Sequence, residues 1–256
     1  MSPTFSNEDA TRATELLGPG AGGIDWYHTQ ELAPGLLTPG MFDLRPLVAR
    51  YGLADDLDGL RALDVGTFEG FWAFELERRG AEVVGLDIDD LRDLDWPPRL
   101  RPAEGGTRGE GFALARRALG SAVERVAVPI YEADPGRLGT FDLVFCGSVM
   151  IHLRDPMLAL ERLVALCRPG ARLVFADEYS PKLDRLRFLG VRSAAEFLGD
   201  SPWMTWWRPS SRTWLTMVRC AGWEQARIHG RFDMRFRAGR GGVPHVVIHA
   251  QAPADR

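Results

Sequence analysis

The sequence predicts an α/β fold in which a mostly parallel sheet carries helices on both faces. Short apolar runs that end at glycine or acidic residues alternate along the chain with segments of helical spacing. The clearest unit lies between residues 62 and 87, where an apolar run, a glycine turn, a helix and a second apolar run follow one another. The chain has 256 residues, 45% of them hydrophobic and 26% charged, which suits one large domain of this class.

The N-terminal part of the chain differs from this alternation. Residues 1–23 are polar and then rich in glycine, which predicts a loose or weakly helical tail. Residues 24–58 hold Trp26, Tyr27 and His28, and end with an amphipathic stretch. We therefore expect residues 1–58 to form a tail and a cap or lid, and residues 59–256 to form the main domain.

The elements of the main domain follow in order. We expect strands at residues 62–65, 83–86, 126–131, 141–145, 173–176, 226–229 and 243–250. We expect helices at residues 71–79, 112–123, 157–167 and 214–221. The segments 92–109 and 180–209 are rich in Pro, Arg, Gly or Trp and read as irregular, and a longer segment, about 180–215, would cover a substrate.

Composition excludes several classes of protein. The net charge of −4 does not favour a broad nucleic-acid surface, and no stretch approaches the roughly 20 apolar residues of a membrane span. The start of the chain is polar and acidic, unlike a signal peptide. Cys146, Cys167 and Cys220 are too few and too scattered for a disulfide framework or a metal motif, and predict buried thiols of a cytoplasmic protein.

The strongest chemical signal is Asp64-Val65-Gly66-Thr67-Phe68-Glu69-Gly70, between the first strand and its helix. Glycine at 66 lets the backbone turn tightly and approach a ligand, and the helix after it presents free N–H groups. Asp87 ends the second strand, where a carboxylate can accept hydrogen bonds from both ribose hydroxyls of an adenosine. The pattern predicts a nucleoside site, although a plain turn remains open for each feature alone.

This motif resembles the first motif of the class I S-adenosylmethionine (SAM) methyltransferases, Asp/Glu-x-Gly-x-Gly-x-Gly. Positions 64, 66 and 70 match, Phe68 replaces the middle glycine, and the Gly-x-Gly-x-x-Gly of nicotinamide enzymes is absent. Four later segments are similar to family motifs in the same order: residues 86–88, 133–134, 141–146 and 168–173.

The resemblance covers about residues 60–250 and implies a Rossmann-like class I methyltransferase fold. Such a fold has a seven-stranded, mostly parallel sheet with a C-terminal antiparallel hairpin, here with the N-terminal cap, and binds SAM, with S-adenosylhomocysteine (SAH) as product. The resemblance implies that Asp87 holds the ribose of SAM, that Ile88 lies against its adenine ring and that Asp134 lies near the adenine amino group. It also implies that residues 66–70 lie under the methionyl part. The implied cofactor residues are Asp64, Gly66, Thr67, Phe68, Gly70, Asp87, Ile88, Asp134, Cys146 and Gly147.

A narrower resemblance is to the branch identified as tRNA wobble-uridine (carboxy)methyltransferase-like. It rests on segments 26–28, 37–40, 146–156 and 206–209. In the members that transfer a carboxymethyl group, a tyrosine holds the extra carboxylate of the cofactor, and this chain has Ile151 there. We therefore expect neither carboxymethyl transfer nor a nucleic-acid partner.

Candidate catalytic and substrate residues follow strand ends and aromatic clusters. His152 follows the fourth strand and has a suitable pKa for a general base, and Glu178 follows the fifth strand at the same edge. Each has an alternative as an ordinary structural or loop residue. The candidate substrate residues, for which core packing is the alternative, are Trp26, His28, Tyr179, Trp206 and Trp207.

The sequence thus favours a cytoplasmic SAM-dependent methyltransferase that transfers a methyl group to O, N or C of a small molecule, as in the tailoring of natural products. Two alternatives remain: a tRNA wobble-uridine methyltransferase, and a SAM-binding enzyme that does not transfer methyl. The acceptor and the oligomeric state do not follow from the sequence.

Overall fold

The computed structural model describes residues 7–18, 21–106, 108–199, 201 and 203–255. Its helices are α1 (Asn7–Leu17), α2 (Phe71–Arg78), α3 (Glu110–Leu119), α4 (Pro135–Leu138), α5 (Pro156–Ala165), α6 (Pro181–Arg185) and α7 (Ser211–Cys220). Its strands are β1 (Glu31–Ala33), β2 (Leu36–Leu37), β3 (Arg61–Val65), β4 (Glu82–Asp87), β5 (Glu124–Ala127), β6 (Phe141–Gly147), β7 (Cys167–Glu178), β8 (Ala195–Phe197), β9 (Trp207–Pro209), β10 (Glu224–Arg235) and β11 (Gly242–Gln251).

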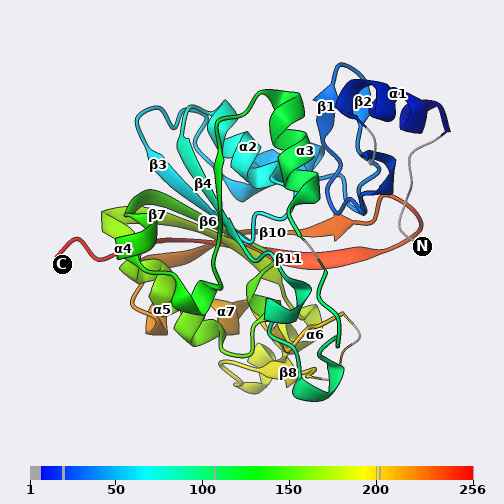
Figure 1. The fold of residues 1–256 in the computed structure, drawn as a ribbon. Coiled ribbons are helices and arrows are strands. Elements are labelled where there is room, and N and C mark those ends of the chain that lie inside the picture. Colours follow the sequence, from blue (N-terminus) through cyan, green and yellow to red (C-terminus); the bar gives the residue numbers. More distant parts are fainter. Residues whose placement is uncertain (1–6, 19–20, 107, 200, 202, 256) are drawn as a thin grey trace.

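A seven-stranded sheet with the order β10-β11-β7-β6-β3-β4-β5 forms the centre of the fold (Figure 1). The five neighbouring strands β5, β4, β3, β6 and β7 are parallel, and β11 pairs antiparallel with both β7 and β10. This confirms the predicted α/β class, the seven strands and the C-terminal antiparallel hairpin. The chain runs outward from β3 through β4 to β5 and then returns to β6 on the other side of β3. The switch point of the sheet therefore lies between β3 and β6, where open α/β sheets bind ligands at the carboxyl ends of the strands.

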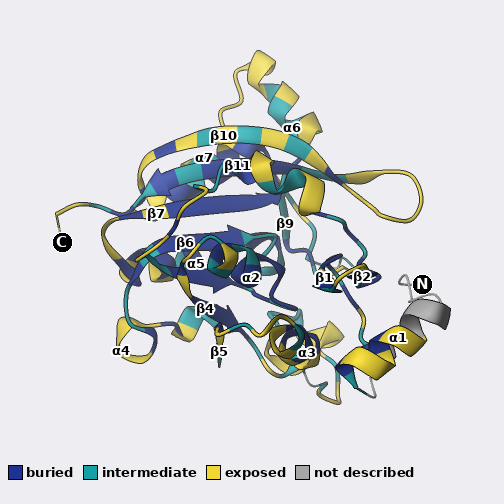
Figure 2. Ribbon diagram, turned by 90° about the horizontal axis from the view of Figure 1, so that it is seen from above, coloured by how far each residue is buried: buried dark blue, intermediate teal, exposed yellow. Residues whose placement is uncertain are grey.

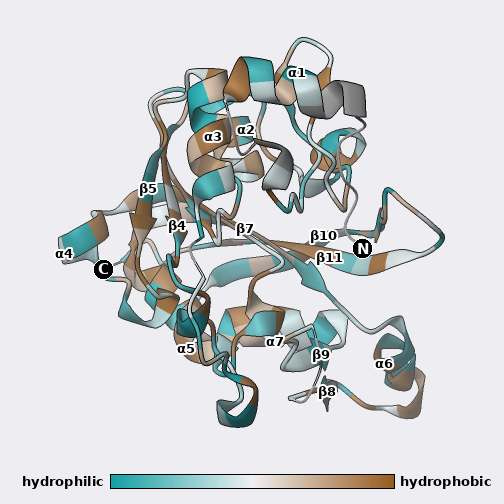
Figure 3. Cartoon of the chain, turned by 45° about the vertical axis from the view of Figure 1, so that its right-hand side comes forward, coloured by the Kyte–Doolittle hydropathy of each residue, from teal (hydrophilic) through white to brown (hydrophobic). Residues whose placement is uncertain are grey.

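Two hydrophobic clusters pack on the two faces of this sheet. One joins the sheet to α5 and α7, and the other joins it to α1, α2, α3 and the N-terminal segment. The sheet is the most deeply buried layer (Figure 2), and its middle strands are largely hydrophobic (Figure 3). Parallel strands that are covered on both faces consist of continuous apolar runs. For this reason the hydrophobic pattern of the sequence predicts these strands.

Several predicted boundaries were wrong for local reasons. The third strand ends at Ala127 instead of residue 131, because Pro129 lacks an N–H to continue it. The helix predicted to residue 123 ends at Leu119, where Gly120 adopts a left-handed conformation. β7 begins at Cys167 and includes the turn that was expected to precede it.

Other parts are more ordered or more exposed than expected. The described part of the predicted tail contains α1, whereas its residues 1–6, 19 and 20 lie outside the described residues. The segment predicted as irregular contains α6, β8 and β9. Cys220 is exposed, unlike the buried Cys146 and Cys167. Within the described residues, no helix is long and apolar enough to cross a membrane.

Candidate active site

A cavity of about 320 Å³ lies at the carboxyl ends of β3, β4, β5 and β6, beside the switch point of the sheet. We call it the switch-point cavity. Its lining comes from the N-terminal segment, from the loops after these four strands, and from residues 203 and 204 ahead of β9. The cavity is therefore closed by segments that are far apart in the sequence, as expected of a site built on strand ends.

The glycine loop after β3 forms the floor of the cavity. Gly66 has a φ of 69°, and a Cβ there would lie 2.5 Å from the Cγ2 of Val149. Phe68 holds a φ of 49°, although it is not glycine, in the place where the family pattern has its middle glycine. A non-glycine residue in this region carries backbone strain, and such strain is concentrated at ligand sites.

Asp87 joins the glycine loop to the end of β4. Its Oδ2 accepts a hydrogen bond from the backbone N–H of Phe68 at 2.7 Å, and its Oδ1 accepts one from that of Ile88 at 2.8 Å. Each carboxylate oxygen keeps a further lone pair, so both can also accept from a pair of neighbouring hydroxyls. Arg108 stacks 4.4 Å over the Phe68 ring and lies 3.8 Å from Asp87.

The N-terminal segment is fastened to the glycine loop through Glu69. The carboxylate of Glu69 accepts a hydrogen bond from the backbone N–H of Tyr27 and pairs with the Nδ1 of His28 at 3.1 Å. The side-chain amide of Gln30 donates to the backbone carbonyl of Glu69 at 3.1 Å. Because Tyr27 and His28 line the cavity, this buried carboxylate sets the position of one wall.

We expect the substitution Glu69→Ala to lower the free energy of unfolding by about 2 kcal/mol, because it leaves the buried Tyr27 N–H and His28 without their acceptor. Urea unfolding measures this change. The matched control is Glu82→Ala, which removes an ion pair with Arg61 from a side chain that is 74% exposed. The control is expected to cost about 0.5 kcal/mol. Equal losses in the two variants would contradict this role of Glu69.

Ser148, which lines the cavity, is hydrogen-bonded to the buried side chain of His245. The hydroxyl of Ser148, whose φ is 57°, lies 2.8 Å from the Nε2 of His245. His245 Nδ1 lies 2.9 Å from the carbonyl of Val243, so Nδ1 carries the hydrogen and Nε2 accepts from Ser148. Burial lowers the pKa of His245 to about 4. Burial raises the pKa of Tyr27, whose phenol lies beside Ser148. The imidazole of His245 and the phenol of Tyr27 are therefore both neutral near pH 7.

His152 lines the cavity, and a hydrogen bond at one of its ring nitrogens fixes the tautomer of the imidazole. Its Nδ1 lies 3.2 Å from the backbone carbonyl of Met204, which can only accept, so Nδ1 carries the hydrogen. No hydrogen bond to Nε2 is found among the described residues. Burial lowers the pKa of His152, and nearby Arg108 lowers it further. The ring is therefore neutral at pH 7 and holds a basic lone pair at Nε2.

Asp95 accepts hydrogen bonds from three other segments near the cavity. Its carboxylate accepts from the hydroxyl of Tyr131 at 2.6 Å and from the backbone N–H of Arg154 at 2.7 Å. Its backbone carbonyl accepts from the indole of Trp206 at 2.7 Å. Asp95, Tyr131 and Met204 all line the cavity, and no sequence pattern marked Asp95 beyond its position in a loop.

The structure brings together about half of the predicted site residues. Those that line the switch-point cavity are His28, Gly66, Phe68, Asp87, Ile88, Gly147 and His152. Thr67 and Asp64 lie buried beneath the loop, and burial raises the pKa of Asp64 to about 7. Gly70 precedes α2 and Cys146 is enclosed in the core, so neither contributes to the lining.

The remaining predicted residues lie outside this lining. Asp134 is exposed and caps α4, accepting from the backbone N–H of Gly136. Glu178 accepts from the guanidinium of Arg208 at 2.8 Å. Four aromatic residues pack or bond elsewhere: Trp26, Tyr179, Trp206 and Trp207.

Comparison with known proteins identifies the family. Residues 41–225 match the family model described as a methyltransferase domain. The chain belongs to this methyltransferase family. It is a SAM-dependent methyltransferase, which confirms the class I resemblance and the expected cofactor.

Individual relatives are distant. The "Ubiquinone biosynthesis O-methyltransferase" of Bordetella avium is 28% identical over 181 residues, which are 70% of this chain and 68% of the relative. Among solved structures, the N-terminal domain of EvdMO1 with SAH bound has a TM-score of 0.60 at 15% identity, with 97% of this chain and 98% of the other covered. A Burkholderia thailandensis 1,6-didemethyltoxoflavin-N1-methyltransferase, with its substrate and SAH bound, has a TM-score of 0.52 at 18% identity and covers 82% and 78%.

The residues of the switch-point cavity fit SAM. Asp87 offers two acceptor oxygens for ribose hydroxyls, and beside it the apolar side chains of Ile88, Val128 and Ile130 offer a surface for a flat adenine ring. The glycine loop fits the methionyl part, because its backbone can approach a ligand closely. His152 and Met204 line the same cavity as these residues.

Proposed function

We propose that this methyltransferase methylates a hydroxyl oxygen of a small, mainly apolar molecule, with His152 as general base. The observation that carries the proposal is the fixed tautomer of His152. Its Nδ1–H is held by the Met204 carbonyl, which leaves the Nε2 lone pair available within the cavity. A hydroxyl must lose its proton as it attacks, whereas a neutral amine or thioether can attack without a base.

The reaction needs few groups from the protein. When bound, SAM supplies an activated methyl group on its sulfonium sulfur. Asp87 holds the ribose, and the Tyr27 side of the cavity with the segments fixed by Asp95 confines the acceptor. His152 Nε2 would take the proton of the acceptor hydroxyl, so that this oxygen could accept the methyl group that SAM supplies, with SAH as the leaving product. Alignment of the two reactants accounts for most of the expected acceleration.

The comparisons support a small acceptor. The relative from Bordetella avium is named an O-methyltransferase of ubiquinone biosynthesis, and the Burkholderia enzyme holds a small heterocycle. The net charge of −4 and the replacement of the carboxylate-binding tyrosine by Ile151, which is buried in the core, both favour a small molecule over tRNA. We further propose that the acceptor is a natural product that the enzyme tailors.

The test is SAH release from SAM with a panel of matched acceptors. The panel pairs hydroxylated aromatic compounds with the same rings bearing an amine, and includes bulk tRNA at low salt. We expect turnover with at least one hydroxylated compound, and we expect the His152→Asn variant to lose it. Any turnover of the amine partner, which can attack without a base, should not depend on His152. Turnover with tRNA alone, or none in the panel despite SAH binding, would contradict the proposal.

The pH profile of turnover is a second test of His152 as base. The base must be unprotonated, and burial lowers its pKa below the ordinary 6.5. Activity is therefore expected to stay level from pH 8 down to about 6.5 and to fall only below that value. Stopped assays across this range, with SAH binding measured in parallel, check the prediction. A fall in kcat centred above pH 7 would contradict it.

A further inference from the structure

A second and larger cavity, of about 560 Å³, lies at the opposite end of the sheet. It is bounded by the first residues of the parallel part of β7, by the last residues of β11 and by the segment 52–60 ahead of β3. It shares no lining residue with the switch-point cavity. We call it the basic groove. A ligand bound there would not meet the cofactor, so the methyltransferase activity leaves this groove without a role.

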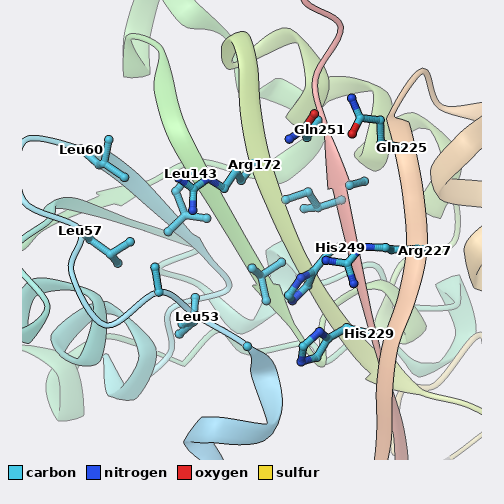
Figure 4. Close-up of a pocket in the computed structure, with 15 residues that line it drawn as sticks. Leu53, Leu57, Leu60, Leu143, Arg172, Gln225, Arg227, His229, His249 and Gln251 are labelled. Carbon is cyan, nitrogen blue, oxygen red and sulfur yellow. The ribbon is translucent and has the colours of Figure 1, made fainter.

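The two walls of the basic groove differ in chemistry (Figure 4). Leucine side chains from the segment ahead of β3 and from β6 form one wall, where Arg172 of β7 lies beside Leu143, and basic and amide side chains from β10 and β11 form the other. The leucines are Leu53, Leu57, Leu60 and Leu143. The basic and amide residues are Arg172, Gln225, Arg227, His229, His249 and Gln251. No Asp or Glu is among the described residues that line the groove.

Within the part of the chain that the structure describes, no carboxylate neutralises the two arginines of the groove. Arg172 and Arg227 have no ion-pair partner among the described residues, in contrast to Arg61, Arg79 and Arg125, which pair with carboxylates. Guanidinium groups bind carboxylates through two parallel hydrogen bonds when one is offered. Two unpaired arginines beside an apolar wall therefore leave room for an external anion.

The histidines of the groove are held in a defined arrangement. His229 and His249 stack with ring centroids 4.2 Å apart and an interplanar angle of 12°. His249 Nε2 lies 2.8 Å from the carbonyl of Tyr51 and so donates to it, which directs the lone pair to Nδ1. Burial lowers the pKa of His249, and the neighbouring His229 and Arg227 lower it further. A bound anion would raise the pKa of His249.

Two residues with a left-handed backbone conformation, Gly52 and Gln225, line the groove near the histidine pair. Gly52 has a φ of 66°, and a Cβ there would lie 2.5 Å from the Nε2 of His229 and 2.8 Å from the Cε1 of His249. The end of the N-terminal segment thus approaches the histidine pair as closely as only glycine permits. Gln225, at the bulged start of β10, has a φ of 51° and also lines the groove. Left-handed non-glycine residues are concentrated at ligand sites.

We propose that the basic groove is a binding site for a small organic anion, a carboxylate on an apolar aromatic or aliphatic body. The carboxylate would lie against Arg227 and the histidine pair, and the apolar body against the leucines. The volume lies within the range of about 300–1,000 Å³ typical of small-molecule sites. This site is independent of the proposed O-methylation, and either proposal can fail without the other.

The test uses 1-naphthoate as the probe, with 1-naphthamide as its uncharged match, titrated calorimetrically into the protein saturated with SAH. We expect naphthoate to bind about tenfold more tightly than the amide, since one charge-assisted pair is gained. The exposed Arg227→Gln substitution should remove this preference. Arg235→Gln, an exposed arginine farther along β10, is the matched control and should retain it. Equal affinity for acid and amide, or equal effects of the two substitutions, would overturn the proposal.

Histidine NMR locates the bound probe. The titratable and charged groups that line the groove around His249 are the imidazole of His229 and the guanidinium of Arg227 on β10, and that of Arg172 on β7. Binding of naphthoate should raise the pKa of His249 and leave the resonances of His152 unchanged, because His152 lines the other cavity. A shift of His152 without one of His249 would place the probe in the switch-point cavity and overturn the proposal.

Discussion

Replacing His152 with asparagine is expected to lower kcat by about 10²–10⁴-fold while SAH affinity stays within about twofold. An asparagine amide can still donate to the Met204 carbonyl, as Nδ1 does now, but it has no basic nitrogen at the position of Nε2. The change therefore removes the proton acceptor and preserves the link between two walls of the cavity. Steady-state turnover and calorimetric titration with SAH separate the two effects.

The matched control for this prediction is Glu178→Gln. Glu178 was the other candidate base, but its carboxylate accepts from Arg208 and does not line the switch-point cavity. We expect its kcat to remain within about twofold of the unchanged enzyme, because a paired carboxylate outside the cavity does not meet the acceptor. An active His152→Asn variant together with an inactive Glu178→Gln variant would show that the base was assigned to the wrong strand end.

The largest expected effect on cofactor binding comes from Asp87→Ala. The loss of two charge-assisted hydrogen bonds to ribose corresponds to about 3 kcal/mol, or about 100-fold weaker SAH binding. The substitution also releases the backbone N–H groups of Phe68 and Ile88, which shape the glycine loop. Calorimetric titration with SAH measures the loss.

Asp134→Ala provides the comparison for Asp87. Asp134 is exposed and caps the short helix α4 through the N–H of Gly136. Its removal is expected to cost about 1 kcal/mol of stability as a lost helix cap, with SAH affinity unchanged within about twofold. Equal losses of SAH affinity in the two variants would mean that the adenosine lies nearer to α4 than the cavity indicates.

The fold could be predicted because its signals are local. Each parallel strand is covered on both faces and so reads as an apolar run, and the glycine turn after β3 with Asp87 after β4 marks the end of the sheet that binds ligands. The boundaries that failed depended on single residues such as Pro129 and Gly120. The fold class therefore followed from short segments, whereas the cofactor class rested on a resemblance carried by five motifs between residues 64 and 173.

The half of the cavity that faces the acceptor could not be predicted in this way. Ser148 and His245 are 97 residues apart in the chain and meet only because β11 pairs with β7. The tryptophans near residue 206 were expected either to line a pocket or to pack in the core. Trp203 lines the switch-point cavity, whereas the indole of Trp206 turns to the carbonyl of Asp95. Composition shows that aromatic residues gather there, but not which way each ring points.

The sequence did anticipate His152, because the loop after β6 must border the cavity. It did not anticipate that the Met204 carbonyl fixes its tautomer, since that contact spans 52 residues. It placed Glu69 only within the loop expected under the methionyl part, and did not anticipate that Glu69 fastens the N-terminal segment across 42 residues through Tyr27. Long-range hydrogen bonds of this kind decide the chemistry, and they become visible only in three dimensions.

The most direct test of the account is the identity of the methylated atom. Turnover with SAM carrying a ¹³C-labelled methyl group, followed by NMR of the product, shows whether the new carbon is bonded to oxygen, nitrogen or carbon. We expect a methoxy carbon on a small molecule, formed by the unchanged enzyme and lost in the His152→Asn variant. A label on nitrogen or carbon, or a methoxy product formed equally well without His152, would contradict it.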